Sequence, residues 1–593
     1  MATPCQGMGI RSGPTEAFWP SWFALSPLWA SIVVLFDGSA HAVAAKVTSV
    51  AAPSASVPPF GIAQWSLTVE GVTTKPWEAL NITLDITPPK GGRPYYATIK
   101  GYHHGDNEWR VRAALQDVGE FHYKLNVVQD GNLLHSSAGT LVCAADAEAH
   151  PTSVGPKGFL RPRFGQFPYR TAFDDSTLFN GFGLGDCLND DLTFPTFENG
   201  TTFTRTLDQY VKDYADAGFN IFRWSDGNCA WRIQESFDGD DAPWRPNGNE
   251  YNETTAALLD RIFDTFRSNG FSMWSVIFSK DDNSKLPVFP YLGNTDKLSH
   301  LAQRASLGAY LDFVVARWGA QTDVWSLLNE QRAETAWLQW VARYLRSIDP
   351  YRHPISSSWD DHLQLPEIEI NSVHWYYSSP IAGDVYTSNA TQEDKAMADQ
   401  AQNQLAAGKP VYFTETGMGH HNWDPESHIL MRIRSWTAFF EACVLMWWNT
   451  AGSTKYHGIA GNMYLGLKER GYQKVLRAFV NEMIDPAVAQ LNMTASDGVR
   501  AYGVIGAGAH GNGKVLMAYV QHYSSHRSNI TAQITFAPSK YFRSLIGCVG
   551  TWVHPVTGAT EPATQPKGLT YTTPVFSIDM ALRVNCPSEE LII

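Results

Sequence analysis

Two apolar runs that each lead into a glutamate decide the fold of this chain: Val324-Trp325-Ser326-Leu327-Leu328-Asn329-Glu330 and Pro410-Val411-Tyr412-Phe413-Thr414-Glu415-Thr416-Gly417. Short runs of this kind are typical of strands that are buried on both faces, as in a parallel sheet. The stretch between them has room for several strand–helix units. Because the strands of a parallel barrel all end at one mouth, we expect both carboxylates to lie there.

The sequence around these runs alternates between strand-like and amphipathic helical segments. Strands are expected at 179–183, 219–223, 273–278, 324–328, 355–359, 372–376, 411–413 and 444–448. Helices are expected at 206–217, 255–268, 301–318, 334–348, 393–405, 425–440 and 472–483. Such alternation favours an α/β fold, a closed (β/α)8 TIM barrel over residues 158–485.

Shorter alternating runs separated by turns lie on both sides of the barrel. They predict an N-terminal β-sandwich over residues 60–150 and a C-terminal β-sandwich over residues 486–593. Residues 45–59 are rich in Ala, Ser, Pro and Val, a composition that predicts a linker. The predicted architecture is therefore a TIM barrel flanked by two β-sandwich domains.

The first 44 residues resemble an export signal. Residues 18–36 are largely apolar, and small residues follow in Ala40-His41-Ala42. This pattern predicts a signal peptide over residues 1–44, hence a secreted protein with no stable membrane insertion after cleavage. An uncleaved signal anchor is the alternative.

Export would allow disulfides and glycosylation. Of the seven cysteines, Cys5 would leave with the signal, and we favour the pairings Cys187–Cys229 and Cys548–Cys586 among the many that the other six allow. Sequons for N-glycosylation occur at Asn81, Asn199, Asn252, Asn389, Asn492 and Asn529.

Composition narrows the function classes. Hydrophobic residues make up 44% and charged residues 17% of the 593 positions, as in a globular protein. The net charge of −13, without a Lys/Arg-rich run, disfavours a nucleic-acid partner. No Cys-x-x-Cys motif occurs and the adjacent histidine pairs lack a ligand set, so we expect no metal and no cofactor.

At the predicted strand ends the barrel resembles the clan A glycoside hydrolases, and family 5 in particular. Asn329-Glu330 ends the fourth strand, where such enzymes hold the acid/base, and Glu415 ends the seventh, where they hold the nucleophile. The resemblance also implies substrate-binding roles for strand-end residues of the second, fourth, sixth and eighth strands: Arg223, Asn329, His374, Tyr376 and Trp448.

The flanking domains carry resemblances of their own. Gly101-Tyr102-His103-His104-Gly105 and Gly119-Glu120-Phe121-His122-Tyr123 are similar to the domain of unknown function family 5060, which precedes some of these barrels. Trp552-Val553-His554-Pro555-Val556-Thr557-Gly558 resembles a hairpin of the accessory β-domain of apiosidase-like hydrolases.

The chemistry of glycoside hydrolysis fits this set of residues. A retaining enzyme needs one protonated carboxyl to donate to the leaving oxygen and one ionised carboxylate to attack the anomeric carbon, about 5–5.5 Å apart. We expect Arg223 and Tyr376 to hold Glu415 ionised through hydrogen bonds. Asn329 would contact the sugar 2-hydroxyl and Trp448 would offer a flat face to the sugar ring. Either Trp447 or Trp448 could belong to the core, and we expect one of them inside and one in the site. His374 either binds substrate or braces the site.

The sequence therefore predicts a secreted retaining O-glycoside hydrolase that cleaves β-linked oligo- or polysaccharides. Two alternatives remain open: a transglycosylase that uses the same site, and a non-catalytic carbohydrate-binding protein on the same fold. The feature that favours an enzyme is the intact pair Glu330 and Glu415 together with Arg223.

Overall fold

The structure is a computed structural model of the 593-residue chain. It describes residues 45–72, 76–145, 157–164, 170–185, 193–198, 201–225, 251, 253–279, 301–330, 333, 335–358, 363–376, 390–417, 427–448, 465–483, 488–508 and 513–587. The predicted signal peptide, residues 1–44, lies outside this set, as do Cys187 and Cys229. Both remain predictions.

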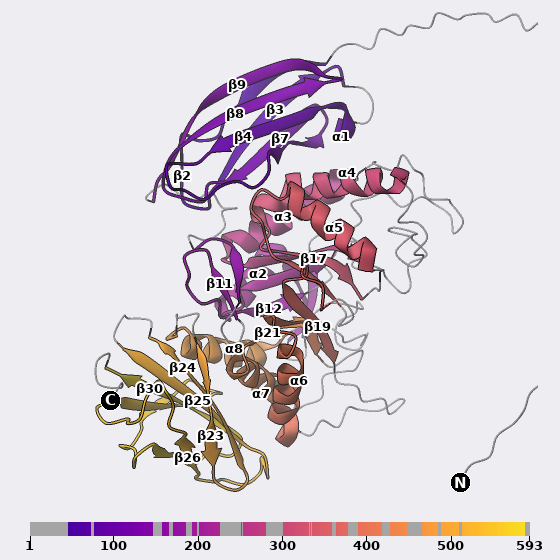
Figure 1. The fold of residues 1–593 in the computed structure, drawn as a ribbon. Helices are drawn as coiled ribbons and strands as arrows, with labels where there is room; N and C mark the ends of the chain where they lie inside the picture. Colours follow the sequence, from indigo (N-terminus) through magenta and orange to yellow (C-terminus); the bar gives the residue numbers. More distant parts are fainter. Residues whose placement is uncertain are drawn as a thin grey trace, which may run out of the picture. The chain divides into compact units, whose positions relative to one another are not determined.

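The centre of the fold is a closed barrel of eight parallel strands (Figure 1). β12 pairs with both β15 and β21, which closes the sheet. The barrel and all eight predicted strands are confirmed. The strands are β12 (Phe182–Gly185), β15 (Ile221–Ser225), β16 (Ser272–Ser279), β17 (Val324–Asn329), β18 (Ile355–Ser358), β19 (Ile370–Tyr376), β20 (Val411–Gly417) and β21 (Cys443–Trp448).

Helices alternate with these strands, also as predicted. They are α2 (Leu207–Asp216), α3 (Glu253–Ser268), α4 (Leu301–Trp318), α5 (Thr335–Ile348), α6 (Glu393–Leu405), α7 (Ser427–Phe440) and α8 (Leu467–Val480). The start of α2 shows how local sequence fixes a boundary. The Thr206 hydroxyl accepts from the Gln209 amide while the Gln209 side chain accepts from the Thr206 amide, a capping box.

The barrel strands are buried on both faces, which explains their nearly continuous apolar sequence. Trp274, Val276 and Tyr412 belong to one cluster of buried side chains, together with residues of other barrel strands. Their strand neighbours Met273 and Phe413 belong to a second cluster, which includes the helices around the barrel. The period of two along each strand thus divides the residues between the barrel interior and the helical layer.

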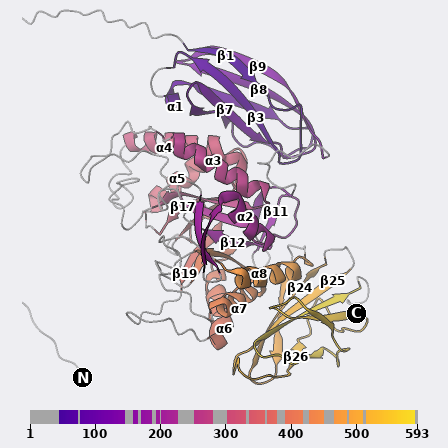
Figure 2. The same cartoon turned by 180° about the vertical axis from the view of Figure 1, so that it is seen from behind.

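The N-terminal domain is a sandwich of two sheets, with strand orders β1-β3-β7-β6 and β2-β9-β8-β4-β5 (Figure 2). A short helix, α1 (Pro76–Ala79), precedes β4. The strands are β1 (Lys46–Ala51), β2 (Ser56–Val57), β3 (Ile62–Glu70), β4 (Asn81–Thr87), β5 (Ile99–Lys100), β6 (Tyr102–Gly105), β7 (Glu108–Ala114), β8 (Gly119–Gln129) and β9 (Asn132–Cys143).

The prediction of a linker at 45–59 was wrong, because β1 and β2 lie in this segment and belong to the sandwich. β1 pairs with β3 through the backbone, and Val47 and Val50 pack against the domain core. Such an edge strand is mostly exposed and can be built from small and polar residues. Its composition therefore looks like that of a linker, although the segment is ordered by backbone pairing.

Two further hairpins precede the barrel helices: β10 (Leu160–Arg163) with β11 (Arg170–Phe173), and β13 (Thr193–Glu198) with β14 (Thr201–Thr206). The sequence pattern does not predict these two hairpins. In the described part of the chain, no helix is long and apolar enough to cross a membrane.

The C-terminal domain has a six-stranded sheet, β22-β24-β25-β30-β27-β28, and a three-stranded sheet, β23-β26-β29. Its strands are β22 (Ala489–Leu491), β23 (Met493–Ala495), β24 (Val499–Ala507), β25 (Lys514–His522), β26 (Gln533–Phe536), β27 (Val549–Val553), β28 (Thr560–Pro562), β29 (Thr570–Thr572) and β30 (Asp579–Cys586).

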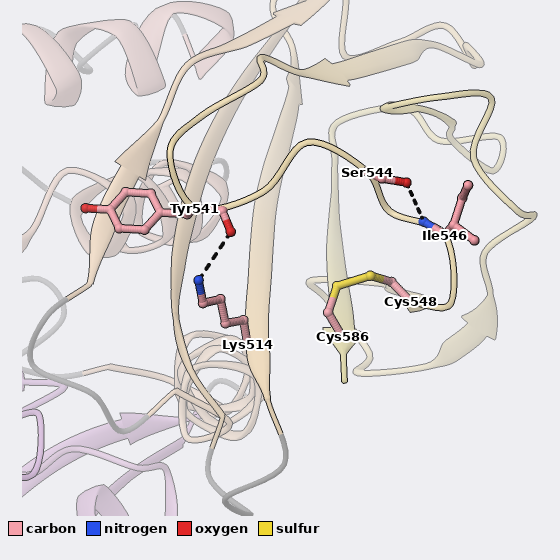
Figure 3. The surroundings of a disulfide bond; sticks show 6 residues. All are labelled: Lys514, Tyr541, Ser544, Ile546, Cys548 and Cys586. Carbon is pink, nitrogen blue, oxygen red and sulfur yellow. Dashed lines mark hydrogen bonds between the residues drawn. A yellow bond between two sulfur atoms is a disulfide. The ribbon is translucent and has the colours of Figure 1, made fainter. Parts of the chain in front are cut away.

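The predicted disulfide between Cys548 and Cys586 is present (Figure 3). It joins the residue before β27 to the last residue of β30. Nearby, the Lys514 ammonium donates to the Tyr541 carbonyl at 3.2 Å, and the Ile546 amide donates to the Ser544 hydroxyl at 3.2 Å. The disulfide thus links two neighbouring strands, β27 and β30, at one end of the six-stranded sheet.

Buried and partly buried ion pairs connect both sandwiches to the barrel helices. Arg432 of α7 contacts Asp579 of β30 at 2.9 Å, and both side chains are 2% exposed. Asp394, in the first turn of α6, contacts Arg500 of β24 at 2.6 Å. On the other side, Asp260 of α3 contacts Arg112 of β7 at 3.3 Å.

Candidate active site

The two predicted carboxylates lie at the carboxyl ends of β17 and β20. All six residues of β17 are buried, and Glu330 follows directly as an exposed residue with a φ of 47°. Glutamate rarely adopts this left-handed conformation. The Glu330 amide donates to the Ser358 hydroxyl at 2.9 Å, and that hydroxyl donates to the Leu328 carbonyl at 2.6 Å. Ser358, at the end of β18, thus fixes the turn that presents the carboxylate.

The two carboxyl groups and one imidazole form a compact group. A carboxylate oxygen of Glu330, a carboxylate oxygen of Glu415 and a ring nitrogen of His374 all lie within 4.8 Å of one another. The register explains the contact between strands, because His374 of β19 is paired directly with Glu415 of β20. The structure therefore brings together the residues that the sequence predicted at separate strand ends.

Glu415 is the buried member of the pair and is held by three side chains. Its Oε1 lies 2.8 Å from Nη1 of Arg223, and its Oε2 accepts a hydrogen bond from the Tyr376 hydroxyl. Nδ1 of His374 lies 3.4 Å from the same Oε2. Arg223 and Glu415 have side chains only 1% and 5% exposed. A buried carboxylate needs such a counter-charge and hydrogen-bond donors to remain ionised.

Tyr376 remains a hydrogen-bond donor at any physiological pH. Burial raises the pKa of its hydroxyl well above the usual value, and the negative charge of Glu415 raises it further. The Arg223 guanidinium opposes this shift with a smaller effect. Loss of the phenol proton is therefore disfavoured next to the carboxylate.

Glu330 has a more open environment. Its side chain is 39% exposed, and its Oε1 lies 2.8 Å from Nδ1 of His374, whose side chain is 5% exposed. With Glu330 ionised, the imidazole donates this bond from Nδ1. His374 therefore contacts both carboxylates, and both interpretations of its role remain predictions.

Asn329 and Trp448 both contact Arg223. Nη2 of Arg223 donates to the Asn329 amide oxygen at 2.6 Å. The guanidinium carbon lies 5.1 Å from the centre of the Trp448 ring, within the range of a cation–π contact. Trp448 is 7% exposed. Arg223 is thus the centre that connects β15, β17, β20 and β21.

Trp447 lies on the other side of β21 from Trp448. It is 3% exposed, and the Arg434 guanidinium of α7 lies 5.7 Å from the centre of its ring. One tryptophan of the pair therefore contacts the site and the other packs in the helical layer.

Gly185, at the end of β12, is a site residue that the sequence analysis missed. A Cβ at this position would lie 2.3 Å from Cε3 of Trp448. Only glycine leaves room for the indole there. Ser358 was missed as well, because a serine at the end of a strand gives no signal in the sequence until its spatial neighbour is known.

The spacing of Glu330, His374 and Glu415 would also suit a metal ion. The contacts argue against one. The Arg223 guanidinium lies 2.8 Å from Glu415 and would stand next to the cation, which like charges disfavour. The three groups already pair with each other and with Arg223 and Tyr376.

No family model matches the chain, and no curated protein matches it. Among solved structures, the chain is similar to a candidate glycoside hydrolase from Bacteroides vulgatus ATCC 8482, with a TM-score of 0.57 and 14% identity over 89% of this chain and 99% of that chain. The chain shares the fold of that protein. At this identity the likeness extends to the fold and not to individual site residues.

Two weaker likenesses carry no argument of their own. One is to a family 39 glycoside hydrolase from the gut symbiont Bacteroides cellulosilyticus WH2, with a TM-score of 0.41 and 12% identity over 91% of this chain and 100% of that chain. The other is to an endo-1,4-beta-mannanase from Rhizomucor miehei, with a TM-score of 0.37 and 15% identity over 49% of this chain and 90% of that chain.

Proposed function

We propose that the protein is a secreted retaining glycoside hydrolase that cleaves β-linked oligo- or polysaccharides. The observation that carries this proposal is the pair Glu330 and Glu415, whose nearest ligand oxygens lie within 4.8 Å at one mouth of the barrel. Retaining enzymes hold their carboxyl groups about 5–5.5 Å apart, whereas inverting enzymes hold them about 6.5–9.5 Å apart to admit a water. The spacing supports direct attack by a carboxylate.

The environments of the two groups suit different roles. Glu415 is buried beside Arg223 and accepts from Tyr376, so it is the group that stays ionised and attacks the anomeric carbon. Glu330 has a side chain that is 39% exposed and is therefore open to solvent and substrate, so we assign it the protonation of the leaving oxygen. In the second step Glu330 removes a proton from water, which then hydrolyses the glycosyl ester on Glu415.

The remaining predicted residues have supporting roles in this proposal. Arg223 and Tyr376 stabilise the Glu415 carboxylate when it leaves the ester again. His374 orients Glu330 through the 2.8 Å contact. Asn329 is oriented by Arg223 for contact with a sugar hydroxyl, and Trp448 lies beneath the guanidinium at the edge of the site.

The wider context supports the same proposal. The protein from Bacteroides vulgatus that shares the fold is described as a candidate glycoside hydrolase. The β-specificity follows from the resemblance to clan A, and secretion follows from the predicted signal peptide. The Cys548–Cys586 disulfide is compatible with an oxidising compartment.

The direct test is turnover of a panel of aryl β-glycosides and polysaccharides by the full chain and by Glu415→Gln. We expect the full chain to release reducing ends from at least one substrate and the variant to release none. Absence of turnover across the panel by a folded wild-type chain would overturn the proposal. Sugar transfer to an added acceptor, detected by mass spectrometry, would instead favour the transglycosylase.

A further inference from the structure

One of the buried arginines, Arg434 of α7, lies behind the candidate active site. Its side chain is 2% exposed. Nη1 donates to the Thr416 hydroxyl at 2.7 Å, and the guanidinium carbon lies 4.3 Å from the centre of the Trp375 ring and 5.7 Å from that of Trp447. A guanidinium can satisfy such contacts together because it is planar, stacks on aromatic faces and donates in its plane.

The three residues that Arg434 contacts form one row across the sheet. Trp375 of β19 is paired with Thr416 of β20, and Thr416 is paired with Trp447 of β21. The Thr416 hydroxyl also donates to the Trp375 carbonyl at 3.0 Å. Arg434 therefore contacts three neighbouring strands at the same height.

Each residue of this row is adjacent in sequence to a residue of the site. Trp375 lies between His374 and Tyr376, Thr416 follows Glu415, and Trp447 precedes Trp448. Successive side chains of a strand point to opposite faces of the sheet. The residues on one face are fixed by the helical layer, and their neighbours on the other face form the candidate active site.

Arg434 is itself anchored from the opposite side. Its Nε lies 2.6 Å from Oε1 of Glu393, the first residue of α6, which is fully buried. Burial raises the pKa of Glu393 to about 7, and the attraction of Arg434 opposes that rise. The next residue, Asp394, binds Arg500 and Tyr502 of the C-terminal domain. The guanidinium is thus held between two helices and three strands.

We propose that Arg434 is a positioning residue, which fixes the ends of β19, β20 and β21 and thereby sets the place of the Glu415 carboxylate and its hydrogen-bond donors. Arg434 itself does not touch the reacting atoms. Its effect passes through the hydrogen bond that it donates to the Thr416 hydroxyl of β20. This inference rests on the proposed function, since it identifies the residue that keeps the Glu415 carboxylate in position to attack.

The test uses Thr416, because substitution of Arg434 would leave Glu393 buried without its partner and could prevent folding. Thr416→Val keeps the shape of the side chain and removes the hydroxyl, whereas Thr416→Ser keeps the hydroxyl. The matched control is Thr437→Val. Thr437 is also fully buried and lies on α7, but its hydroxyl donates to the Ile433 carbonyl of its own helix at 2.9 Å.

The kinetic readout is kcat and KM on the best aryl glycoside of the panel. A carboxylate displaced by a fraction of an ångström attacks poorly, so we expect Thr416→Val to lower kcat by about tenfold or more with KM nearly unchanged. Thr416→Ser should restore most of the wild-type kcat. Thr437→Val should retain the wild-type kcat even if its melting temperature falls as far as that of Thr416→Val. Equal kcat in Thr416→Val and Thr437→Val would overturn the inference.

The second readout does not depend on turnover. Crystal structures of Thr416→Val, Thr416→Ser and the wild type should show the Glu415 carboxylate displaced from Arg223 only in Thr416→Val. If the wild type hydrolyses nothing, the proposed function fails and this comparison still decides the positioning role. An unmoved Glu415 carboxylate in Thr416→Val would overturn that role, whatever the enzyme acts on.

Discussion

The hydroxyl of Ser358 accepts the amide hydrogen of Glu330 at 2.9 Å, at the point where the backbone of Glu330 turns to a φ of 47°. The contact joins the ends of β17 and β18. A left-handed glutamate is strained and persists only when its surroundings hold it there. Here the strain places the candidate acid/base outside the strand and over the barrel mouth.

Ser358→Ala should therefore damage both stability and activity. It removes an acceptor for the Glu330 amide, in a partly buried hydrogen bond, and a donor to the Leu328 carbonyl, in a buried one. Loss of these bonds should lower the free energy of unfolding by about 1–3 kcal/mol, measured by urea denaturation. Activity on natural substrates should fall more than activity on activated aryl glycosides. Ser357→Ala, one residue earlier and also buried, is the control.

Glu415→Gln should abolish hydrolysis while the protein stays folded. The amide is nearly isosteric and can keep a contact with Tyr376, but it cannot form the glycosyl ester. Circular dichroism and the melting temperature establish that the variant is folded, and the assay is product release by mass spectrometry. Wild-type activity in this variant would remove Glu415 from the mechanism.

Glu330→Ala should slow natural substrates most and aryl glycosides with good leaving groups least, because a good leaving group needs no proton in the glycosylation step. Azide should then restore turnover by attacking the glycosyl ester in place of activated water. The product should be the β-glycosyl azide, identified by NMR. If both substrate types lose activity equally and azide has no effect, Glu330 is not the acid/base.

The first-formed product should keep the anomeric configuration of the substrate. Carboxyl oxygens within 4.8 Å of each other match the spacing of about 5–5.5 Å in retaining enzymes better than the about 6.5–9.5 Å of inverting enzymes, so we expect two successive inversions and net retention. Proton NMR recorded before mutarotation distinguishes the two anomers. An inverted product would mean that another pair of carboxylates, with a wider spacing, performs the reaction.

The Cys548–Cys586 disulfide should stabilise the C-terminal sandwich. It closes a loop with a sequence separation of 38, and loops of this size give about 2–4 kcal/mol of stabilisation in the chain-entropy model. The double variant Cys548→Ala, Cys586→Ala should show a lower melting temperature than wild type under oxidising conditions. Reducing agent should lower the wild-type melting temperature and leave that of the variant unchanged.

The barrel was predictable from the sequence because its strands are buried on both faces and separated by helices with a clear period. Runs such as 324–330 and 410–417 can be recognised without any neighbour. The same holds for the carboxylates, because the end of a parallel strand fixes their place. Arg223 and Tyr376 were predictable only through resemblance to a known family.

The contacts that complete the site were not predictable, because they depend on register and on close approach. In the sequence nothing marks the three residues that complete the site: Ser358 and Gly185 are small residues at strand ends, and Arg434 is one of two arginines in a helix. Their roles appear when Ser358 lies beside Glu330, when Gly185 lies beneath Trp448, and when Arg434 lies behind Thr416. Strand β1 was missed for a related reason, since backbone pairing orders it without a distinctive side-chain pattern.

The buried pair of Arg432 and Asp579 joins the last sandwich to the barrel, so this domain is not an interchangeable module. A chimera that replaces residues after 486 with a foreign domain would leave the Arg432 charge on α7 without its carboxylate, and truncation would do the same. Removing one partner of such a buried pair typically lowers the free energy of unfolding by about 3–5 kcal/mol. Swapping this domain, in the laboratory or in evolution, therefore requires a change on α7 at the same time.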